Sequence, residues 1–589
     1  MSEVCVELVG KLVGEMLGLS KEELSPSDNL ISLGLGSLDI MRIAGLLTKN
    51  GCNVTFSELV SNPCMASWVN FARERSARSS SNGSPLLGSA NYSKGDPFPI
   101  TSVQHAYMVG RRDGQELGGT ACHAYMEFEC GSLDAAKLER AVELLILRHP
   151  MLRARFSDDG TARIEDKVTW KGLTTYRVEG AGNPDSRIEG IRQELSHLRF
   201  DIEQDDLIDV RLTVVSPKRT IMHINVDLLA ADVLSIQVLL EDLAHLYDGT
   251  DLAPIEIDFM EYARRTGIGE DARNEDREYW LNRIDNMPGG PSLPLKAPME
   301  SVKRSQFTRM EYLIDSKSWK NFTEKGRQIG VTQSMGIAAV YAKALSRWSE
   351  DKKFLLNLPL FNRKPIHPDV DKIVSDFTSL ILLEADCANA ISLLELASQM
   401  QGRFQQDVAH SSFGAVEVLR ELSHRCPNDP KKAPVVFASN IGTQFISNKV
   451  EDVFGPLSKM LAETPQVLLD HQIYDHKNGL LLAWDYVSEL LDDKIAKQMF
   501  EAYCTAVRFY CENDWSEPFP DLLPPSQRAA RAEANSEGAD LGGGTLHGRF
   551  FARAQAEPDA PALRWGADGE ATYGELAGRA LRIAGGLAA

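Results

Sequence analysis

The sequence predicts a multidomain protein in which a small all-α unit precedes a larger α/β domain with two lobes. Three observations support this prediction. Apolar residues recur at helical spacing through residues 1–74, and helix-like and strand-like segments alternate from 98 to 522 without a long polar break. Stretches rich in small and polar residues follow each of these regions. The 589 residues are also too many for one hydrophobic core.

The composition limits the classes of function. A content of 43% hydrophobic and 25% charged residues is typical of a globular protein. The net charge of −20 argues against binding to nucleic acid or to an anionic membrane surface. No run approaches the ~18 apolar residues of a membrane span, and the N-terminus lacks the basic start and apolar core of a signal peptide. We therefore expect a cytoplasmic protein.

The nine cysteines are scattered and form no C-x-x-C pair. This spacing favours reduced thiols over a disulfide framework or a zinc site, and we expect no metal centre.

The first unit, residues 1–74, predicts helices at its start, from about Ser37 onward, and in "CMASWVNFARER". The apolar positions that indicate the first two helices are Val4, Leu8, Leu12, Val13, Met16, Leu38, Met41 and Leu47. Residues 75–97 are rich in Ser, Gly, Asn and Pro, which predicts a flexible linker.

The α/β region divides into an expected N-lobe, 98–275, and C-lobe, 276–522. "DAAKLERAVELLILRHP" has strong helical periodicity, while "RTIMHINVDLLA" and "KKFLLNLPLF" are typical of buried strands. Residues 523–544 predict a second linker. Residues 545–589 are rich in Ala and Gly and indicate the beginning of another domain.

Two local patterns suggest chemistry. Ser37 lies where a loop enters a helix, so it is either an N-cap or an exposed hydroxyl that accepts a covalent group. In "NVDLLAADVLSIQ", Asp227 and Asp232 interrupt an apolar run. A buried carboxylate is costly unless it is paired or hydrogen-bonded, so both aspartates need partners.

Five segments in order carry a resemblance to a known family: "FPITSVQHAYMVGR", "RHPMLRARF", "DLLAADVLS", "LPLFNRKPIHPDVDKIVSDFTSLILLEAD" and "TPQVLLDHQIYDHKNGLLLAWD". They resemble the heterocyclization domains of non-ribosomal peptide synthetases, which are variants of the condensation domain. Residues 1–74 resemble the carrier (thiolation) domain of the same synthetases. The resemblance implies a four-helix carrier bundle followed by a two-lobed pseudodimer of the chloramphenicol-acetyltransferase type.

The resemblance also assigns roles to the residues above. Ser37 would carry a covalent 4′-phosphopantetheine arm, although Gly36 stands where the family usually has Asp. In the family's D-x-x-x-x-D-x-x-S pattern, matched by Asp227, Asp232 and Ser235, the first aspartate would form a buried ion pair. Its candidate partners are Arg148 and Arg153, and Asp232 would lie nearer the substrate tunnel.

The implied chemistry has two steps. An aminoacyl thioester first attacks an acyl thioester to give an amide. The Cys, Ser or Thr side chain then attacks that amide, and loss of water gives a thiazoline or oxazoline. The second step needs a general acid–base with a raised pKa. Asp470 follows three apolar residues and is the best candidate, with Gln472 to orient it, whereas His471 is expected to make local contacts only.

The family's threonine in P-V-V-F-T-S is Ala438 in this chain, which cannot donate a hydrogen bond. Ser439 or Asn440 could substitute through a bulge, although on a regular strand Ser439 would point to the opposite face. Alternatively, Asp470 could work alone. Asp376 and Thr378 of "SDFTS" are retained, and Thr378 either lines the tunnel or bonds its own backbone.

The tail resembles the start of an adenylation domain, which implies partners. We expect a phosphopantetheinyl transferase, downstream adenylation and carrier domains, and a stand-alone ligase that loads an aryl acid, salicylate or 2,3-dihydroxybenzoate, as in siderophore synthetases. Two alternatives stay open. The enzyme could condense without cyclising because of Ala438, or the chain could be a catalytically silent carrier and docking module.

Overall fold

The computed structural model describes residues 2–17, 19, 24–35, 39–40, 43–44, 46–47, 52, 54, 56–75, 95–178, 183–266, 270–361, 363–364, 366–426, 431–536, 545–565 and 569–588. The chain forms two compact units, residues 1–522 and 523–589, which are described separately.

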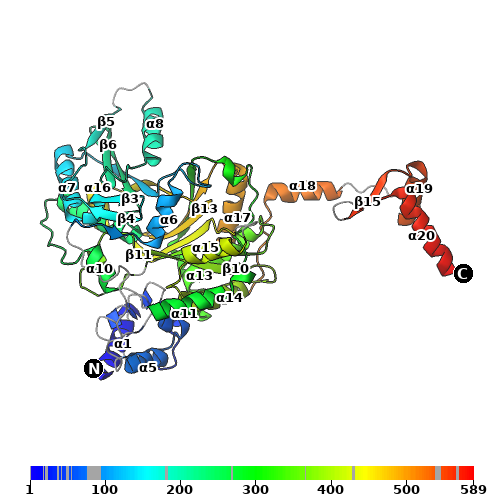
Figure 1. The fold of residues 1–589 in the computed structure, drawn as a ribbon, viewed down its shortest axis with the longest axis horizontal. Coiled ribbons are helices and arrows are strands. Elements are labelled where there is room, and N and C mark those ends of the chain that lie inside the picture. Colours follow the sequence, from blue (N-terminus) through cyan, green and yellow to red (C-terminus); the bar gives the residue numbers. More distant parts are fainter. Residues whose placement is uncertain are drawn as a thin grey trace. The chain divides into compact units, whose positions relative to one another are not determined.

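The N-terminal part of the first unit is helical. Its helices are α1 (Ser2–Leu17), α2 (Leu30–Leu33), α4 (Phe56–Ser61) and α5 (Met65–Arg75) (Figure 1). Leu12 and Val13 are buried as the periodicity predicts, whereas Met16 is exposed. Trp68 anchors the small core, and its indole N–H donates to the Leu59 carbonyl at 2.9 Å. Ser37, the expected attachment residue, lies outside the described residues.

The N-lobe contains a five-stranded sheet in the order β12-β2-β7-β6-β5, in which only β5 and β6 are parallel. Four of its strands come from the N-lobe sequence: β2 (His123–Cys130), β5 (Thr174–Arg177), β6 (Ile208–Ser216) and β7 (Arg219–Asp227). A smaller sheet comprises β1 (Phe98–Pro99), β3 (Ala154–Ser157) and β4 (Thr161–Ile164). The helices are α6 (Ser102–Gly110), α7 (Ala135–Arg148), α8 (Pro184–Ser196), α9 (Val233–Tyr247) and α10 (Phe259–Arg265). The next helix, α11 (Glu270–Leu281), spans the expected division at 275/276 and packs on α15 (Ala415–Arg425) of the C-lobe.

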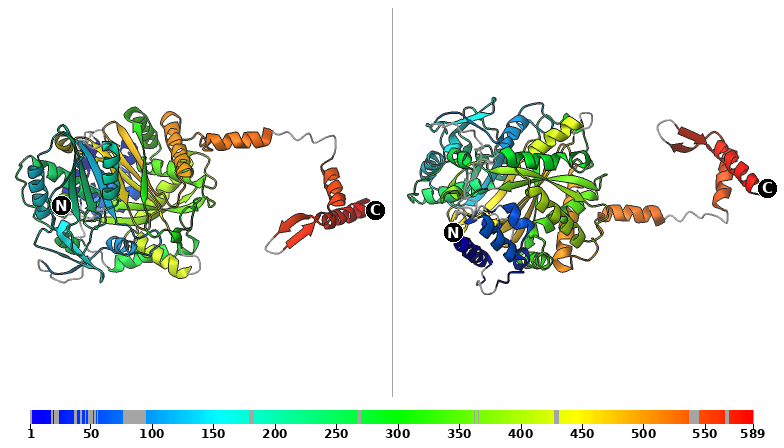
Figure 2. Two further views of the ribbon diagram at one scale, coloured as in Figure 1. Left: turned by 90° about the horizontal axis from the view of Figure 1, so that it is seen from above. Right: turned by 60° about the horizontal axis from the view of Figure 1, so that its bottom comes forward.

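The C-lobe contains a six-stranded sheet in the order β10-β9-β11-β13-β14-β8. Its strands are β8 (Phe307–Asp315), β9 (Lys353–Phe361), β10 (Thr378–Asp386), β11 (Val435–Gln444), β13 (Leu469–His476) and β14 (Gly479–Val487). Its helices are α12 (Ser316–Gln328), α13 (Gln333–Ser346), α14 (Leu393–Val408), α15 (Ala415–Arg425) and α17 (Asp493–Glu512). The helix α16 (Asn448–Phe454) lies in the same part of the sequence but packs on α9 and β2 of the N-lobe. Helices α12, α13, α14 and α17 pack against strands of this sheet (Figures 1 and 2).

One strand crosses between the lobes. β12 (Leu457–Glu463) lies in the C-lobe sequence but pairs antiparallel with β2, with Glu463 opposite His123. The expected division at 275/276 therefore separates the two lobes along the sequence but not in space, because β12 follows the division and belongs to the N-lobe sheet. The two lobes otherwise repeat one arrangement, because the hairpins β6–β7 and β13–β14 each lead into a long helix. The prediction of a two-lobed pseudodimer is confirmed.

The second unit contains α18 (Pro525–Ser536), α19 (Leu546–Ala556), the hairpin β15 (Pro561–Trp565) and β16 (Gly569–Thr572), and α20 (Tyr573–Ala588). Part of the expected linker 523–544 is thus the helix α18, whose residues are not buried.

Among the cysteines whose state the structure describes, all but Cys52 follow the expectation. Free thiols are present at Cys64, Cys122, Cys130, Cys387, Cys426, Cys504 and Cys511. Cys52 is disulfide-bonded, so the expectation of reduced thiols is wrong at this position.

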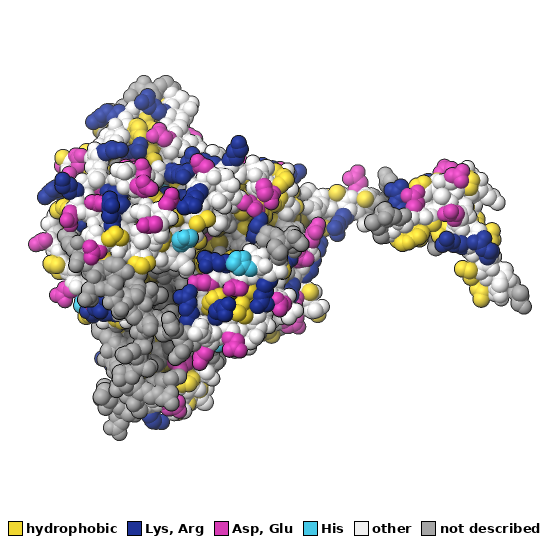
Figure 3. All heavy atoms as spheres, in the orientation of Figure 1, with side chains coloured by type: hydrophobic (Ala, Val, Ile, Leu, Met, Phe, Trp, Pro, Cys, Tyr) yellow, Lys and Arg dark blue, Asp and Glu magenta, His cyan; other side chains and the backbone are white. Residues whose placement is uncertain are grey.

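The face in Figure 3 carries acidic and basic side chains intermingled, without one continuous basic area. Among the described residues, no helix has both the length and the apolar character needed to cross a membrane.

Candidate active site

The lobes share a cavity of about 510 Å³. The N-lobe contributes residues of α6 and of the segment that begins α9, and the C-lobe contributes β9, β10, β11 and β13. Its polar lining includes Tyr107, Asp232, Asn357, Asp376, Thr378, Asn440, Asp470, Gln472 and Tyr474. The fold thus brings most of the expected catalytic residues together in this cavity.

Strand β13 positions the central carboxyl group. Alternate residues of a strand share a face, so Asp470, Gln472 and Tyr474 all reach the cavity. Asp470 is 5% exposed, and its Oδ2 accepts a hydrogen bond from Gln472 Nε2 at 2.6 Å. Its Oδ1 is buried without a hydrogen-bond partner in the part of the chain that the structure describes. One carboxyl oxygen is therefore available to a substrate.

The environment of Asp470 favours its protonated form. Burial, followed by the nearby Asp485 carboxylate, raises the pKa of Asp470 to about 7. A carboxyl group with this pKa can both donate and accept a proton near neutral pH, as a general acid–base must.

His471, on the other face of β13, is expected to make local contacts only, and this is confirmed. Its Nδ1 and Nε2 lie 3.0 Å from the Ala483 carbonyl oxygen and 2.7 Å from the Tyr503 hydroxyl oxygen, and burial lowers its pKa to about 3.

Strand β11 places alanine where the family has threonine. Ala438 lines the cavity and lies directly opposite Gln472 in the parallel pair β11–β13. The neighbouring Ser439 does not line the cavity, and its Oγ lies 2.8 Å from Ser334 Oγ on α13. The irregularity in this pairing begins only after Asn440. The substitute role considered for Ser439 is therefore wrong for this geometry, whereas Asn440 does line the cavity.

The partner of Asp227 is neither of the arginines that the sequence suggested. Arg111, which follows α6, donates from Nη1 and Nη2 to the two carboxylate oxygens of Asp227 at 3.2 and 2.6 Å. The carboxylate of Asp227 is fully buried and also accepts from the Leu229 backbone N–H at 3.1 Å. Asp227 thus forms the expected buried ion pair, but with a residue 116 positions earlier in the chain.

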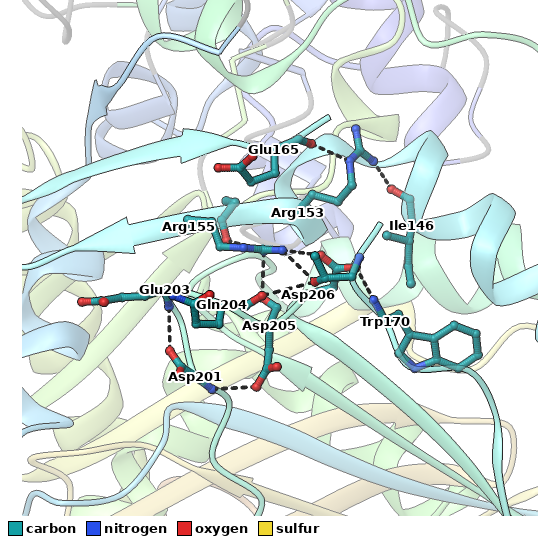
Figure 4. A network of polar contacts seen from close by, with 12 residues as sticks. Ile146, Arg153, Arg155, Glu165, Trp170, Asp201, Glu203, Gln204, Asp205 and Asp206 are labelled. Carbon is teal, nitrogen blue, oxygen red and sulfur yellow. Dashed lines mark hydrogen bonds and ion pairs between the residues drawn. The ribbon is translucent and has the colours of Figure 1, made fainter. Parts of the chain in front are cut away.

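Arg148 and Arg153 have other partners. Arg148 Nε donates to Asp242 at 2.7 Å. Arg153 donates to the carbonyl oxygens of Ile146 and Glu165 beside β3, as Figure 4 shows. Both arginines therefore stabilise the N-lobe without touching Asp227.

Asp232 joins the lobes at the edge of the cavity. Its Oδ1 accepts from the Ser235 N–H at 2.7 Å, which caps α9, and from Arg363 Nη2 at 2.8 Å. Ser235 Oγ in turn donates to the Ser375 carbonyl oxygen at 2.7 Å. Asp232 therefore fixes the "SDFTS" segment beside the cavity, and its extensive pairing argues for a positioning role.

Asp376 is the second cavity carboxyl group with a raised pKa. Its Oδ1 accepts from the Thr378 N–H at 3.0 Å, and burial raises its pKa to about 7. Thr378 lines the cavity, as one of its two expected roles requires.

We expect these carboxyl groups to make stability fall as pH rises. The unfolded chain loses both protons near pH 4, whereas folded Asp376 and Asp470 keep theirs until about pH 7. The protonated groups contribute fully to stability below pH 4, and the contribution is lost as pH rises to about 7. Denaturant unfolding at pH 5 and pH 8 measures this loss, and Asp376→Asn should reduce it by a few kcal/mol. Asp386→Asn, at the other end of β10, is the matched control. An Asp376→Asn protein with the parent's pH dependence would contradict the prediction.

Sequence reasoning missed four contributors to the site. Arg111, Arg309 and Arg363 each pair with a buried carboxylate, and Asn357 lines the cavity with a buried Oδ1 that has no partner among the described residues. Asn357 lies within the quoted segment "KKFLLNLPLF", so a polar residue inside an apolar strand was an available signal for it.

The fold and cavity define a two-lobed domain with the chloramphenicol-acetyltransferase type of fold, preceded by a helical unit. A family model described as "Condensation domain" matches residues 98–513. The chain belongs to this family. A second model, described as "Phosphopantetheine attachment site", matches residues 7–72. The predictions of a carrier unit bearing covalent 4′-phosphopantetheine and of a condensation-type domain are confirmed.

The chain is similar to two curated synthetases. It is 35% identical over 591 residues to "Phenyloxazoline synthase MbtB" of Mycolicibacterium paratuberculosis, covering 98% of this chain and 50% of that protein. It is 36% identical over 587 residues to "Pyochelin synthetase PchE" of Pseudomonas aeruginosa, covering 99% and 40%. The chain thus spans half or less of these relatives' length.

Among solved structures, the EpoB cyclization-docking bidomain of Sorangium cellulosum superposes with a TM-score of 0.67. The two are 29% identical, and the match covers 76% of this chain and 90% of that one.

Proposed function

We propose that this chain condenses an aryl thioester with a carrier-bound Cys, Ser or Thr and cyclodehydrates the product to a thiazoline or oxazoline. The observation that carries the proposal is the unpartnered Oδ1 of Asp470 in a shared cavity, on a carboxyl group whose pKa is about 7. The similarity to a phenyloxazoline synthase and to a cyclization domain supports the same reaction.

The cavity fits a slender thioester-bearing arm, because a few polar groups lie among apolar walls such as Leu117, Val416 and Val467. A 4′-phosphopantetheine arm on Ser37 would supply the thioester that holds the acyl group. The acceptor amine attacks the thioester carbon, and the C–S bond breaks as the amide C–N bond forms.

In the second step the acceptor side chain attacks the amide carbon. The proton of the attacking thiol or hydroxyl passes to the former carbonyl oxygen, which becomes a hydroxyl group. Protonated Asp470 donates a second proton to this group, which leaves as water, and the ring nitrogen returns a proton to the Asp470 carboxylate as the C=N bond forms. Gln472 holds Oδ2 of Asp470, so Oδ1 is the oxygen that meets the substrate.

The name of the relative MbtB supports an aryl donor, since a phenyloxazoline carries an aromatic ring on the heterocycle. Salicylate and 2,3-dihydroxybenzoate are the candidate acids. The partners are then a phosphopantetheinyl transferase, a stand-alone aryl-acid ligase and the adenylation and carrier domains that supply the acceptor. We also propose that the reaction takes place in the cytoplasm. Residues 545–589 are proposed to be the start of an adenylation domain.

The test uses the full chain, converted to its phosphopantetheinyl form and loaded with salicylate at Ser37. A cysteinyl carrier is added in trans, and the acceptor-bound product is read by mass spectrometry. A product lighter by one water than the linear amide is expected. If only the linear amide forms, the chain catalyses condensation without cyclisation. If a loaded carrier transfers nothing, the chain is a docking module without catalytic activity.

Ala438 favours condensation without cyclisation as the second candidate. If the missing hydroxyl limits the second step, Ala438→Thr should raise the ratio of cyclised to linear product several-fold, because residue 438 lines the cavity opposite Gln472. Ser439→Thr, on the opposite face, should leave the ratio unchanged. Equal ratios in parent and Ala438→Thr would show that the site works without this hydroxyl.

A further inference from the structure

A cross-strand row connects Asp470 to an arginine outside the cavity. Asp470 on β13 lies opposite Asp485 on β14, and Asp485 lies opposite Arg309 on β8. Directly paired residues of adjacent strands share one face of a sheet. Two carboxyl groups and one guanidinium therefore follow one another across three strands.

Arg309 neutralises the middle carboxylate. Its Nε and Nη2 donate to Asp485 Oδ1 and Oδ2 at 2.7 and 2.5 Å, which is the bidentate geometry that favours an ionised pair. The side chains of Arg309 and Asp485 are only 6% and 0% exposed. Little water screens their charges from Asp470.

Arg309 also reaches past β14 to β13. Its Nη2 donates to Gln472 Oε1 at 3.0 Å, across Ala483, which lies opposite Gln472 in the sheet. The Tyr474 hydroxyl donates to the same oxygen. With two donors on Oε1, the amide of Gln472 can only turn its NH₂ group toward Asp470 Oδ2.

We propose that Arg309 is a positioning residue for cyclodehydration: it fixes the Gln472 amide against Asp470 and balances the charge of Asp485. Arg309 does not line the cavity, so it acts through these side chains rather than on the substrate. The inference rests on the proposed function, since it assigns Arg309 a part in the second step of that reaction.

Other titratable or charged groups also face this row. They are Tyr107 on α6, Tyr341 on α13, Tyr474 on β13 and Glu311 on β8. Burial raises the pKa of each of these tyrosines, so their hydroxyls stay neutral near pH 7. The charge balance at Asp470 thus depends mainly on Asp485 and Arg309.

The experiment measures cyclised and linear product separately, from pH 5.5 to 9, with the loaded full chain. Asp485→Asn leaves Arg309 unbalanced, so the limb of the cyclodehydration profile near pH 7 should move about one unit lower. Arg309→Lys keeps the charge but loses the fork that holds Gln472, so the rate should fall about tenfold with little shift of the limb. Glu384→Gln is the matched control: this carboxylate on the edge strand β10 pairs with Lys353 on β9 and does not line the cavity, so the variant should change neither.

Removing Arg309 alone leaves Asp485 buried without a partner, so the second variant is the double change Arg309→Gln/Asp485→Asn. It keeps the net charge of the pair, and we expect a limb near the parent's and a rate about tenfold lower. If the double variant cyclises at the parent's rate, the pair is purely structural and the inference is overturned. The inference is also overturned if the pH profile of Asp485→Asn has its limb at the same pH as the parent's. A parent chain that makes only linear amide would instead contradict the proposed function.

Discussion

Asp470→Asn should abolish ring formation while condensation continues. The amide of asparagine has the size of the carboxyl group but cannot exchange a proton near neutral pH. General acid–base catalysis contributes about 10²–10⁴-fold to a rate, so the rate of cyclised product should fall by about that factor. The linear amide should accumulate, because the attack of an amine on a thioester has the better electrophile and leaving group. Mass spectrometry of the acceptor carrier at successive times measures both products.

Asp475→Asn is the matched control for this variant. Asp475 lies on the same strand β13 but does not line the cavity, and its carboxylate accepts from the Gly442 N–H. The control should cyclise at the parent's rate. Ring formation by Asp470→Asn at that same rate would remove Asp470 from the mechanism. Loss of both products would point to a role in condensation as well.

The local part of this site could be predicted from the sequence. Strand alternation correctly separated Ala438 from Ser439, because the side-chain period of a strand is fixed at two. The apolar surroundings of Asp470 predicted its burial, and burial is the main cause of its raised pKa. The side-chain alternation of a strand and the polarity of neighbouring residues are both properties of a short segment, so the sequence of that segment is enough to recognise them.

The partners of the buried charges could not be predicted in the same way. Arg111 reaches Asp227 across 116 positions, and Arg309 reaches Gln472 across 163. These contacts depend on which strands become neighbours, and β12 shows that chain order does not decide this, since it joins the sheet of the other lobe. Arg148 and Arg153 lie in the same lobe as Asp227, but Arg148 donates to Asp242 and Arg153 donates to backbone carbonyls.

A buried pair lies at the hairpin of each lobe, Arg111–Asp227 in the N-lobe and Arg309–Asp485 in the C-lobe, with the aspartate on the second strand of the hairpin. The pairs differ in their surroundings. Asp485 lies in a row with Asp470, whereas Asp227 accepts from Arg111 and from the Leu229 N–H at the turn before α9. In our inference, the buried Arg–Asp ion pair of the C-lobe therefore supports catalysis, whereas that of the N-lobe stabilises the fold.

Asp227→Ala should accordingly lower the free energy of unfolding rather than act on one chemical step. The substitution leaves the Arg111 guanidinium, 4% exposed, without a carboxylate in the N-lobe. Removing one member of a buried pair typically costs about 3–5 kcal/mol, because the remaining charge keeps its desolvation penalty. Denaturant unfolding followed by tryptophan fluorescence measures the loss. Cyclised and linear products should fall together, in proportion to the folded fraction.

Two further variants separate the ion pair from the side chains that form it. Arg111→Met/Asp227→Asn removes both charges and keeps an oxygen for the Leu229 N–H, so it should recover most of the lost stability. Arg112→Ala is the matched control, since the next arginine forms an exposed pair with Asp158 that is worth less than about 1 kcal/mol. If the double variant were as unstable as Asp227→Ala, the cost would come from lost packing. In that case the paired charges would not be the reason why an aspartate lies at this position in the core.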